Sequence, residues 1–255
     1  MSQIEVERRG AVMHIAINRP EKKNALTAEM YMALADAVER AEGEGDVRVM
    51  LLRGKGDAFT AGNDLQDFVQ KPWRGQAVPP ALRFMRVVAS AEKPVVAAVH
   101  GVVVGVGTTI LLHCDLVYAA ENTQFMMPFI NLGIVPEAAS TVLLPLLAGR
   151  QRASELFLLG TPFSAARAYE MGLVNAVVAP DQLLTVASGA AEQLAEKPRA
   201  AVLECKKLIK RAFQSEVERA LMEEFEVIAG RLESLETREA LVAFLEKRKP
   251  DFSGF

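Results

Sequence analysis

Two small-residue loops are the first parts of this sequence whose residue types and spacing could do chemistry. Gly105-Val-Gly107 follows an apolar stretch and opens an expected helix, and Ala58 to Leu65 forms a second loop after another apolar run. Free amides at such turns and helix N-termini can hold a negative charge that develops on oxygen. Each loop alone is typical of an ordinary turn, but together the two could form an oxyanion hole.

Glu137 is the candidate acid or base, because it follows a strongly apolar stretch. The apolar residues before it are Phe125, Met126, Met127, Phe129, Ile130, Leu132, Ile134 and Val135. A carboxyl group in such surroundings is poorly solvated, which raises its pKa and makes its carboxylate a stronger base. The alternative for an isolated glutamate is a solvated surface position.

Other catalytic chemistry has little support. His14, His100 and His113 have no Glu-x-x-His or His-x-x-x-His pairing, so structural roles are expected and no metal site is predicted. Neither a Gly-x-Ser-x-Gly elbow nor a Walker loop is present. The glycines at 105 and 107 resemble a dinucleotide fingerprint, but Ile110 stands where the third glycine should be.

Composition and charge exclude several classes of partner. The chain has 255 residues, 51% of them hydrophobic, and a net charge of −3, so no overall basic field attracts nucleic acid or an anionic membrane surface. The basic cluster Lys206, Lys207, Lys210 and Arg211 is flanked by glutamates and lacks aromatic partners, which favours a solvated helix face over an RNA site. The first ten residues lack a targeting pattern, and two cysteines suggest no disulfide framework; a cytoplasmic location is expected.

The elements that must hold these loops alternate between strand and helix, which predicts a layered α/β core. Expected are a hairpin over Ile4–Ile17, a helix after Thr27, strands at Val47–Leu52, Pro94–Val99, Leu116–Ala120 and near Phe125, helices around Met85 and over Thr108–His113, and an irregular Phe68–Pro80 stretch.

After about Pro180 the sequence becomes helical. Four amphipathic helices are expected over Asp181–Glu196, Pro198–Phe213, Ser215–Leu232 and Glu236–Lys247. The predicted division is therefore a core of residues 1–195 and a helical region of residues 196–255. The apolar positions Leu221, Phe225, Ile228 and Leu232 either cover the core or meet another subunit, and the sequence leaves both open.

The combined motifs resemble the crotonase, or enoyl-CoA hydratase/isomerase, superfamily over nearly the whole chain. The markers are Asn18-Arg-Pro-Glu-Lys-Lys-Asn-Ala-Leu26, Phe59-Thr-Ala-Gly-Asn-Asp-Leu65, Lys93-Pro-Val-Val-Ala-Ala-Val-His-Gly101, Gly105 to Asp115, and Ala165 to Val174. The resemblance implies a spiral of ββα units and C-terminal helices that build homotrimers, often paired as hexamers. It also implies that the backbone amides of Asn63 and Val106 form the oxyanion hole.

The resemblance further implies a bent CoA thioester, bound as substrate with no separate cofactor. Its expected contacts are Lys22, Lys23, Ala25, Leu26, Ala61, Gly62, Asp64 and Leu65, with the two lysines near the phosphates. For the individual lysine side chains, a solvated surface position is the alternative.

The reaction is indicated by two departures from the hydratase pattern. Thr109 and Phe129 stand where a hydratase carries its two glutamates, and neither can act as a carboxylate base. Glu137 instead matches the single catalytic glutamate of one branch of the Δ3,Δ2-enoyl-CoA isomerases, which this chain resembles in the Leu132-Gly-Ile-Val-Pro-Glu137 segment. The predicted activity is therefore conversion of a 3-enoyl-CoA to a 2-trans-enoyl-CoA. Hydration, other crotonase reactions and non-catalytic acyl-CoA binding remain alternatives, and acyl chain length stays open.

Overall fold

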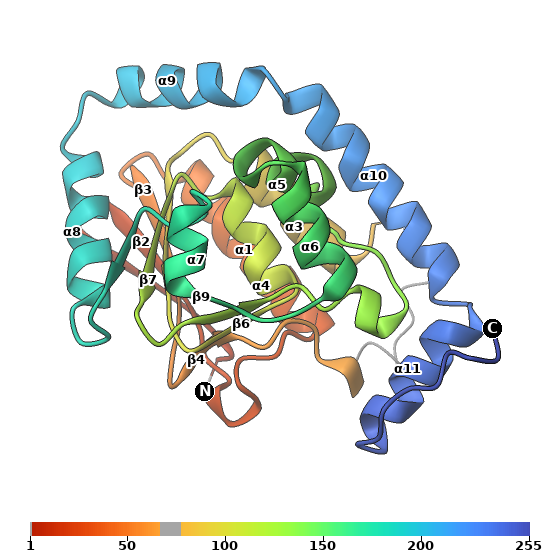
Figure 1. The fold of residues 1–255 in the computed structure, drawn as a ribbon. Helices are drawn as coiled ribbons and strands as arrows, with labels where there is room; N and C mark the ends of the chain where they lie inside the picture. The colour runs from red at the N-terminus through yellow and green to blue at the C-terminus, as the bar shows by residue number, and fades with distance from the viewer. Residues whose placement is uncertain (1, 67–77) are drawn as a thin grey trace.

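Two β-sheets run through the molecule, and between residues 49 and 126 consecutive strands alternate between them (Figure 1). The computed structural model describes residues 2–66 and 78–255, so most of the irregular stretch expected over Phe68–Pro80 lies outside the described residues. The larger sheet contains, in spatial order, β1 (Ile4–Arg9), β2 (Val12–Ile17), β3 (Val49–Gly54), β5 (Val95–Val99), β7 (Leu116–Ala120) and β10 (Ala176–Val178). The smaller contains β4 (Ala58–Thr60), β6 (Val102–Val104), β8 (Gln124–Met126) and β9 (Phe163–Ser164).

The chain forms a spiral because successive strands enter the two sheets in turn. β3 is followed by β4, β5 by β6 and β7 by β8, so each turn adds one strand to each sheet. β3, β5 and β7 are parallel neighbours in the larger sheet, and β4, β6 and β8 are parallel neighbours in the smaller one. This confirms the predicted spiral α/β fold. The carboxyl ends of β4, β6 and β8 consequently meet at one edge.

Helices cover both faces of the larger sheet, because its strands are apolar on both sides. Met13, Ile15, Met50 and Leu52 belong to the main core cluster with residues of α1 (Ala28–Gly43) and α3 (Pro80–Ser90). The alternate residues Val12, Val49, Leu51 and Val96 pack with Leu183, Ala187 and Ala191 of α8 (Leu183–Ala195). Thr27 begins α1 as expected, since its side chain accepts a hydrogen bond from the amide of Met30.

The remaining helices differ in detail from the sequence-based expectation. The helix expected over Thr108–His113 is a short α4 (Val106–Thr109) followed by a 3₁₀ turn, η2 (Ile110–His113). Beyond β8 lie η3 (Ile130–Leu132), α5 (Ser140–Ala148), α6 (Arg150–Leu159) and α7 (Ala165–Glu170), while η1 (Pro20–Lys22) precedes α1. Among the helices of the described residues, none has the length and apolarity that a membrane span requires.

Three C-terminal helices wrap around one side of the core, as the blue ribbons of Figure 1 show. They are α9 (Arg199–Arg211), α10 (Gln214–Arg231) and α11 (Leu235–Leu245). Leu221 of α10 is buried in the core cluster, and Phe225 and Leu232 pack against it. The apolar stripe of α10 therefore covers the core of its own chain. Assembly into a homotrimer or hexamer remains a prediction.

The expectation of a solvated basic face on α9 is wrong for two of its lysines. Lys206 is only 5% exposed, and its ammonium group donates to the carbonyl of Lys93 and to Asp115, both at 2.7 Å. Lys210 donates to the carbonyl of Ala89 at 2.9 Å. Carbonyl and carboxylate oxygens at the ends of core elements thus replace water around these ammonium groups. Lys207, by contrast, is exposed.

Candidate active site

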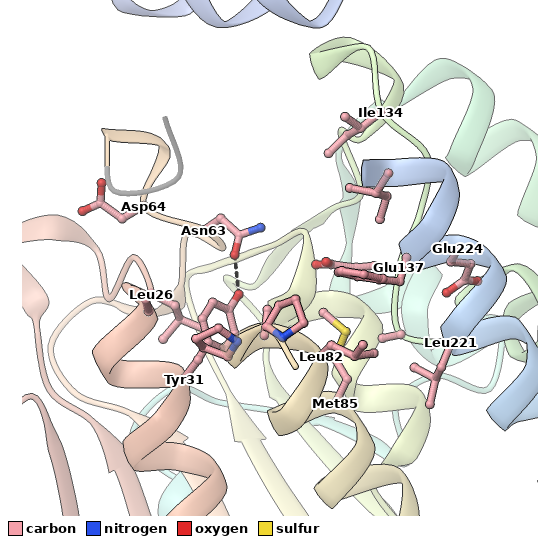
Figure 2. A pocket seen from close by; sticks show the side chains of 17 residues that line it. Leu26, Tyr31, Asn63, Asp64, Leu82, Met85, Ile134, Glu137, Leu221 and Glu224 are labelled. Atoms are coloured by element: carbon pink, nitrogen blue, oxygen red, sulfur yellow. Dashed lines mark hydrogen bonds between the residues drawn. The ribbon is translucent and has the colours of Figure 1, made fainter. Parts of the chain in front are cut away.

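Three loops from the smaller sheet meet at one edge and carry the candidate catalytic groups. Asn63 follows β4, Val106 follows β6, and Glu137 lies in the segment after β8. Figure 2 shows Asn63 and Glu137. The first two loops touch, since a Cβ added to Gly62 would lie only 2.8 Å from the carbonyl oxygen of Val104. Only glycine allows this approach, which brings the Asn63 loop to the start of α4.

The Asn63 loop is also fixed by the Lys22–Leu26 segment. The Leu26 amide donates to the carbonyl of Gly62 at 2.8 Å, and the Asp64 amide donates to the carbonyl of Leu26 at 2.9 Å. In this parallel bridge the flanking residues make the hydrogen bonds, so the Asn63 N–H faces away from Leu26. Within residues 2–66 and 78–255 it has no protein acceptor.

The second amide is presented by an unusual turn. Gly105 has φ of 58° and ψ of −121°, which residues with a side chain rarely adopt, and Val106 is the first residue of α4. A first-turn N–H has no partner inside its helix, and the described part of the chain offers the Val106 amide no other acceptor. The Val106 side chain is 1% exposed and packs in the core, so Val106 can act only through its backbone.

Glu137 lies in an apolar pocket between α1, α3 and α10, with an empty volume of about 750 Å³ that includes the space at its mouth. The apolar lining is Leu26, Ala28, Pro79, Pro80, Ala81, Leu82, Met85, Ile134, Ala138, Leu221, Phe225 and Ile228. One carboxylate oxygen, Oε1, is buried and has no hydrogen-bond partner in the part of the chain that the structure describes. Figure 2 shows the carboxylate and the Asn63 side chain directed into the same space.

The surroundings of Glu137 disfavour its charged form. Burial, and to a smaller extent the charge of the nearby Glu224 carboxylate, together raise the pKa of Glu137 to about 8. A carboxylate with this pKa is a much stronger base than a solvated one. The polar lining of the pocket is completed by Tyr31, Asn63, Asp64 and Glu224.

Tyr31 is a polar residue of the site that the sequence did not identify. Its hydroxyl donates a hydrogen bond to the side-chain oxygen of Asn63 (Figure 2). Burial, and the charge of Glu137, raise the pKa of Tyr31 well above its usual value, so the hydroxyl keeps its proton. The contact orients the Asn63 side chain. Tyr31 lies next to the apolar positions Met30 and Leu34, and this pattern predicts only a core aromatic residue.

Glu224 was also missed, although its position carries a signal. It lies between Leu221, Phe225 and Ile228 on the apolar stripe of α10, where a lone carboxylate is unexpected. Its oxygens accept hydrogen bonds from the amides of Ala139 and Thr141. A charged residue within the apolar stripe of a helix therefore indicates that a polar group in the protein interior binds its side chain.

A groove next to the pocket contains most of the residues predicted to bind CoA. Lys22, Ala25, Ala61, Gly62, Asp64 and Leu65 line it, together with Phe129 and residues of α11. Leu26 lines the apolar pocket instead. Lys23 lines neither space: its ammonium group pairs with Asp57 at 2.6 Å. The groove and the pocket share Asn63, Asp64 and Ile134, so a single extended ligand could occupy both.

The two positions that depart from the hydratase pattern hold no acid or base. Thr109 is fully buried, and its hydroxyl donates to the carbonyl of Gly105 at 3.4 Å. Phe129 is 4% exposed and forms part of the groove wall. Neither residue can activate water.

Two of the three histidines, His113 and His100, make contacts with backbone carbonyl groups. His113 lies 2.7 Å from the carbonyl oxygen of Ala138, and its burial lowers its pKa to about 4, so the ring is neutral. His100 contacts the carbonyl oxygen of Gly56 at 2.9 Å. In the part of the chain that the structure describes, no three His, Cys, Asp or Glu side chains cluster as metal ligands would.

The raised pKa of Glu137 predicts a pH-dependent difference in stability. The unfolded chain releases this proton near pH 4.5, whereas the folded protein keeps it until about pH 8. Between these values folding takes up a proton, so the free energy of unfolding falls as pH rises, by up to about 1.4 kcal/mol per pH unit. Glu137→Gln lacks this titration and should therefore gain stability relative to the parent protein over that window. Urea unfolding of both proteins at several pH values measures this, and parallel pH dependences would mean an unshifted pKa.

Comparison with known proteins identifies the family. The enoyl-CoA hydratase/isomerase family profile matches residues 7–254. The chain is 38% identical over 256 residues to the 1,2-epoxyphenylacetyl-CoA isomerase of Escherichia coli, covering 95% of each protein. It is 31% identical over 254 residues to the 2,3-dehydroadipyl-CoA hydratase of the same organism, covering 100% of each. An enoyl-CoA hydratase/isomerase structure from Pseudoalteromonas atlantica aligns with a TM-score of 0.94 at 41% identity, covering 99% of this chain and 100% of the other.

The spiral fold and these matches define an enzyme of the crotonase type. The chain belongs to the enoyl-CoA hydratase/isomerase family, whose members act on CoA thioesters.

Proposed function

We propose that the protein is a Δ3,Δ2-enoyl-CoA isomerase, which moves the double bond of a 3-enoyl-CoA to the 2-trans position. The observation that carries this proposal is the Glu137 carboxylate, whose buried Oε1 has no hydrogen-bond partner among the described residues and which lies in an apolar pocket beside the Asn63 loop. A 1,3-proton shift needs one base, a stabilised oxyanion and no water. In this site Glu137 is the candidate base, the Asn63 and Val106 amides are the candidate oxyanion donors, and the apolar lining disfavours water.

The proposed mechanism uses one base twice. Ionised Glu137 removes a proton from C2, and the electron pair of the broken C–H bond delocalises through the C3–C4 double bond and the thioester carbonyl. The resulting dienolate oxygen accepts hydrogen bonds from the Asn63 and Val106 amides. Protonated Glu137 then delivers the proton to C4, the double bond forms between C2 and C3, and the carboxylate is restored. The apolar lining protects the dienolate from water.

Hydration is the second candidate, and the pocket does contain a second carboxylate, Glu224. Its two oxygens, however, accept hydrogen bonds from the Ala139 amide, the Thr141 amide and the Thr141 hydroxyl. It is therefore engaged with the backbone and poorly suited to activate water. With Thr109 and Phe129 also inert, the described residues of the site do not provide the pair of free carboxylates that hydration uses.

The proposal is tested with trans-3-hexenoyl-CoA and crotonyl-CoA, by following double-bond position with NMR and added water with mass spectrometry. Conversion of the first to 2-hexenoyl-CoA without hydration of either is the expected result. Hydration of crotonyl-CoA would replace the isomerase assignment with a hydratase. Inertness toward both would reject both activities.

The position of Lys22 predicts a separate effect on CoA-ester binding. Lys22 lines the groove, whereas Lys23 is paired with Asp57 outside it. If the CoA phosphates lie in the groove, Lys22→Ala should weaken acyl-CoA binding by about 1 kcal/mol, or roughly fivefold, since the contact is solvent-exposed. Lys23→Ala is the matched control and should bind normally. Isothermal titration with hexanoyl-CoA distinguishes them, and equal losses for the two variants would contradict this placement.

A further inference from the structure

The segment that carries Glu137 is held at both ends by the C-terminal helices. At its beginning, the carbonyl of Gly133 accepts hydrogen bonds from Nε of Arg231 at 2.8 Å and from the hydroxyl of Thr237 at 3.0 Å. Gly133 itself has φ of 71°, and a Cβ there would lie 2.9 Å from the amide nitrogen of Thr237. The junction of α10 and α11 thus fixes where the segment starts.

At its end, the segment is held by Glu224, which is the charged side chain of α10 that bonds to it there. Ala138 and Ala139, directly after Glu137, have φ of 62° and 53°, a left-handed conformation that costs energy in alanine. Glu224 accepts a hydrogen bond from the Ala139 amide at 2.7 Å, from the Thr141 amide at 3.0 Å and from the Thr141 hydroxyl at 2.6 Å. These contacts hold the strained turn and cap the N-terminus of α5.

We infer that Glu224 is a positioning residue that fixes the Glu137 carboxylate relative to the two amides by holding the Ala138–Ala139 turn. The amides belong to loops of the β-sheet core, whereas the base is held from α10, so Glu224 connects the two halves of the site. This inference rests on the proposed function only in taking Glu137 as the base. Glu224 is not itself a base, because both of its oxygens are occupied.

The titratable groups around Glu137 come from several elements. Glu224 faces it from α10 and Tyr31 from α1, Asp64 lines the same pocket from the loop after β4, and neutral His113 of η2 contacts the neighbouring carbonyl of Ala138. Among the charged groups, Glu224 raises the pKa of Glu137. Removing its charge should therefore lower that pKa, in addition to loosening the turn.

Glu224→Gln tests the inference, because it preserves size but places an amide NH₂ where the backbone needs an acceptor. We expect kcat to fall by roughly 10²-fold, since misplacing a catalytic group by about 1 Å has this effect. KM for the CoA ester should change little, because the groove is formed mainly by other loops. Glu226→Gln, an exposed position on the same helix, is the control and should behave like the parent protein.

A ¹³C NMR titration of carboxyl-labelled glutamate measures the pKa of Glu137 directly and needs no substrate. The Glu137 signal is assigned by its loss in Glu137→Gln. The Glu137 pKa should decrease in Glu224→Gln. Thr141→Val removes the hydrogen bond from the Thr141 hydroxyl to Glu224 but keeps the Glu224 charge, so it should lower kcat with a smaller change in the Glu137 pKa. This variant replaces Glu224→Gln as the test if Glu224→Gln does not fold. An unchanged Glu137 titration in Glu224→Gln, or a lower melting temperature with unchanged kcat, would overturn the inference. A parent protein that titrates as expected but does not isomerise would instead reject only the proposed function.

Discussion

Glu137→Gln should lower kcat for 3-enoyl-CoA isomerisation by about 10²- to 10⁴-fold, the range that a positioned base contributes. Among the described residues of the pocket none is a ready replacement, because Glu224 is bound to the backbone, Asp64 is paired with Arg19, and the Tyr31 hydroxyl is a donor to Asn63. Glutamine retains the shape of the side chain, so acyl-CoA binding should be nearly intact. Steady-state kinetics and a direct binding titration on the same preparation measure the two effects separately.

The control for this prediction is Glu226→Gln, which removes an exposed carboxylate from α10 and should leave kcat unchanged. Retained isomerase activity in Glu137→Gln would reject Glu137 as the base. Loss of acyl-CoA binding together with activity would indicate that the substitution disturbs the pocket and would contradict a purely chemical role.

Gly105→Ala should lower kcat by about 10²- to 10³-fold through loss of one oxyanion donor. An added Cβ would meet no atom within 4 Å, so the effect does not come from a clash. Alanine instead disfavours the φ of 58° and ψ of −121° at this position, and relaxation of the turn redirects the Val106 amide. Kinetics on folded protein, checked by circular dichroism, measure this loss.

Val106→Ala is the matched substitution one residue later. It removes a buried side chain but keeps the amide, so it should cost about 2 kcal/mol of stability while kcat of the folded protein stays close to the parent value. A large fall in kcat for Val106→Ala, with normal activity in Gly105→Ala, would mean that the side chain and not the backbone amide matters here.

Much of the fold could be predicted because local signals agree with it. Thr27 caps α1, and the turn at Gly10 joins the first two strands, since both depend on residues close in sequence. The apolar context of Glu137 likewise predicted a poorly solvated carboxyl group, in agreement with the raised pKa. In each case a few neighbouring residues determine the environment.

The missed features depend on contacts between distant parts of the chain. Glu224 reaches Ala139 across 85 positions, and Lys206 reaches Asp115 across 91, so neither partner is visible in a local pattern. Lys206 was wrongly expected in solvent for this reason. Lys22 and Lys23 are adjacent in sequence, yet the turn after η1 directs only Lys22 to the groove. The positive φ angles of Ala138 and Ala139 could not be predicted from the sequence either, because alanine, unlike glycine or asparagine, is not typical of left-handed turns.

The most direct test of the central claim is to follow the hydrogen that Glu137 moves. Trans-3-hexenoyl-CoA deuterated at C2 is incubated with the protein in ordinary water, and deuterium in the 2-hexenoyl-CoA product is located by NMR and mass spectrometry. The account predicts deuterium at C4 above the solvent level, because one carboxylate in an apolar pocket removes and returns the same hydrogen. Product with only protium at C4, or a hydrated product, would contradict a single shielded base.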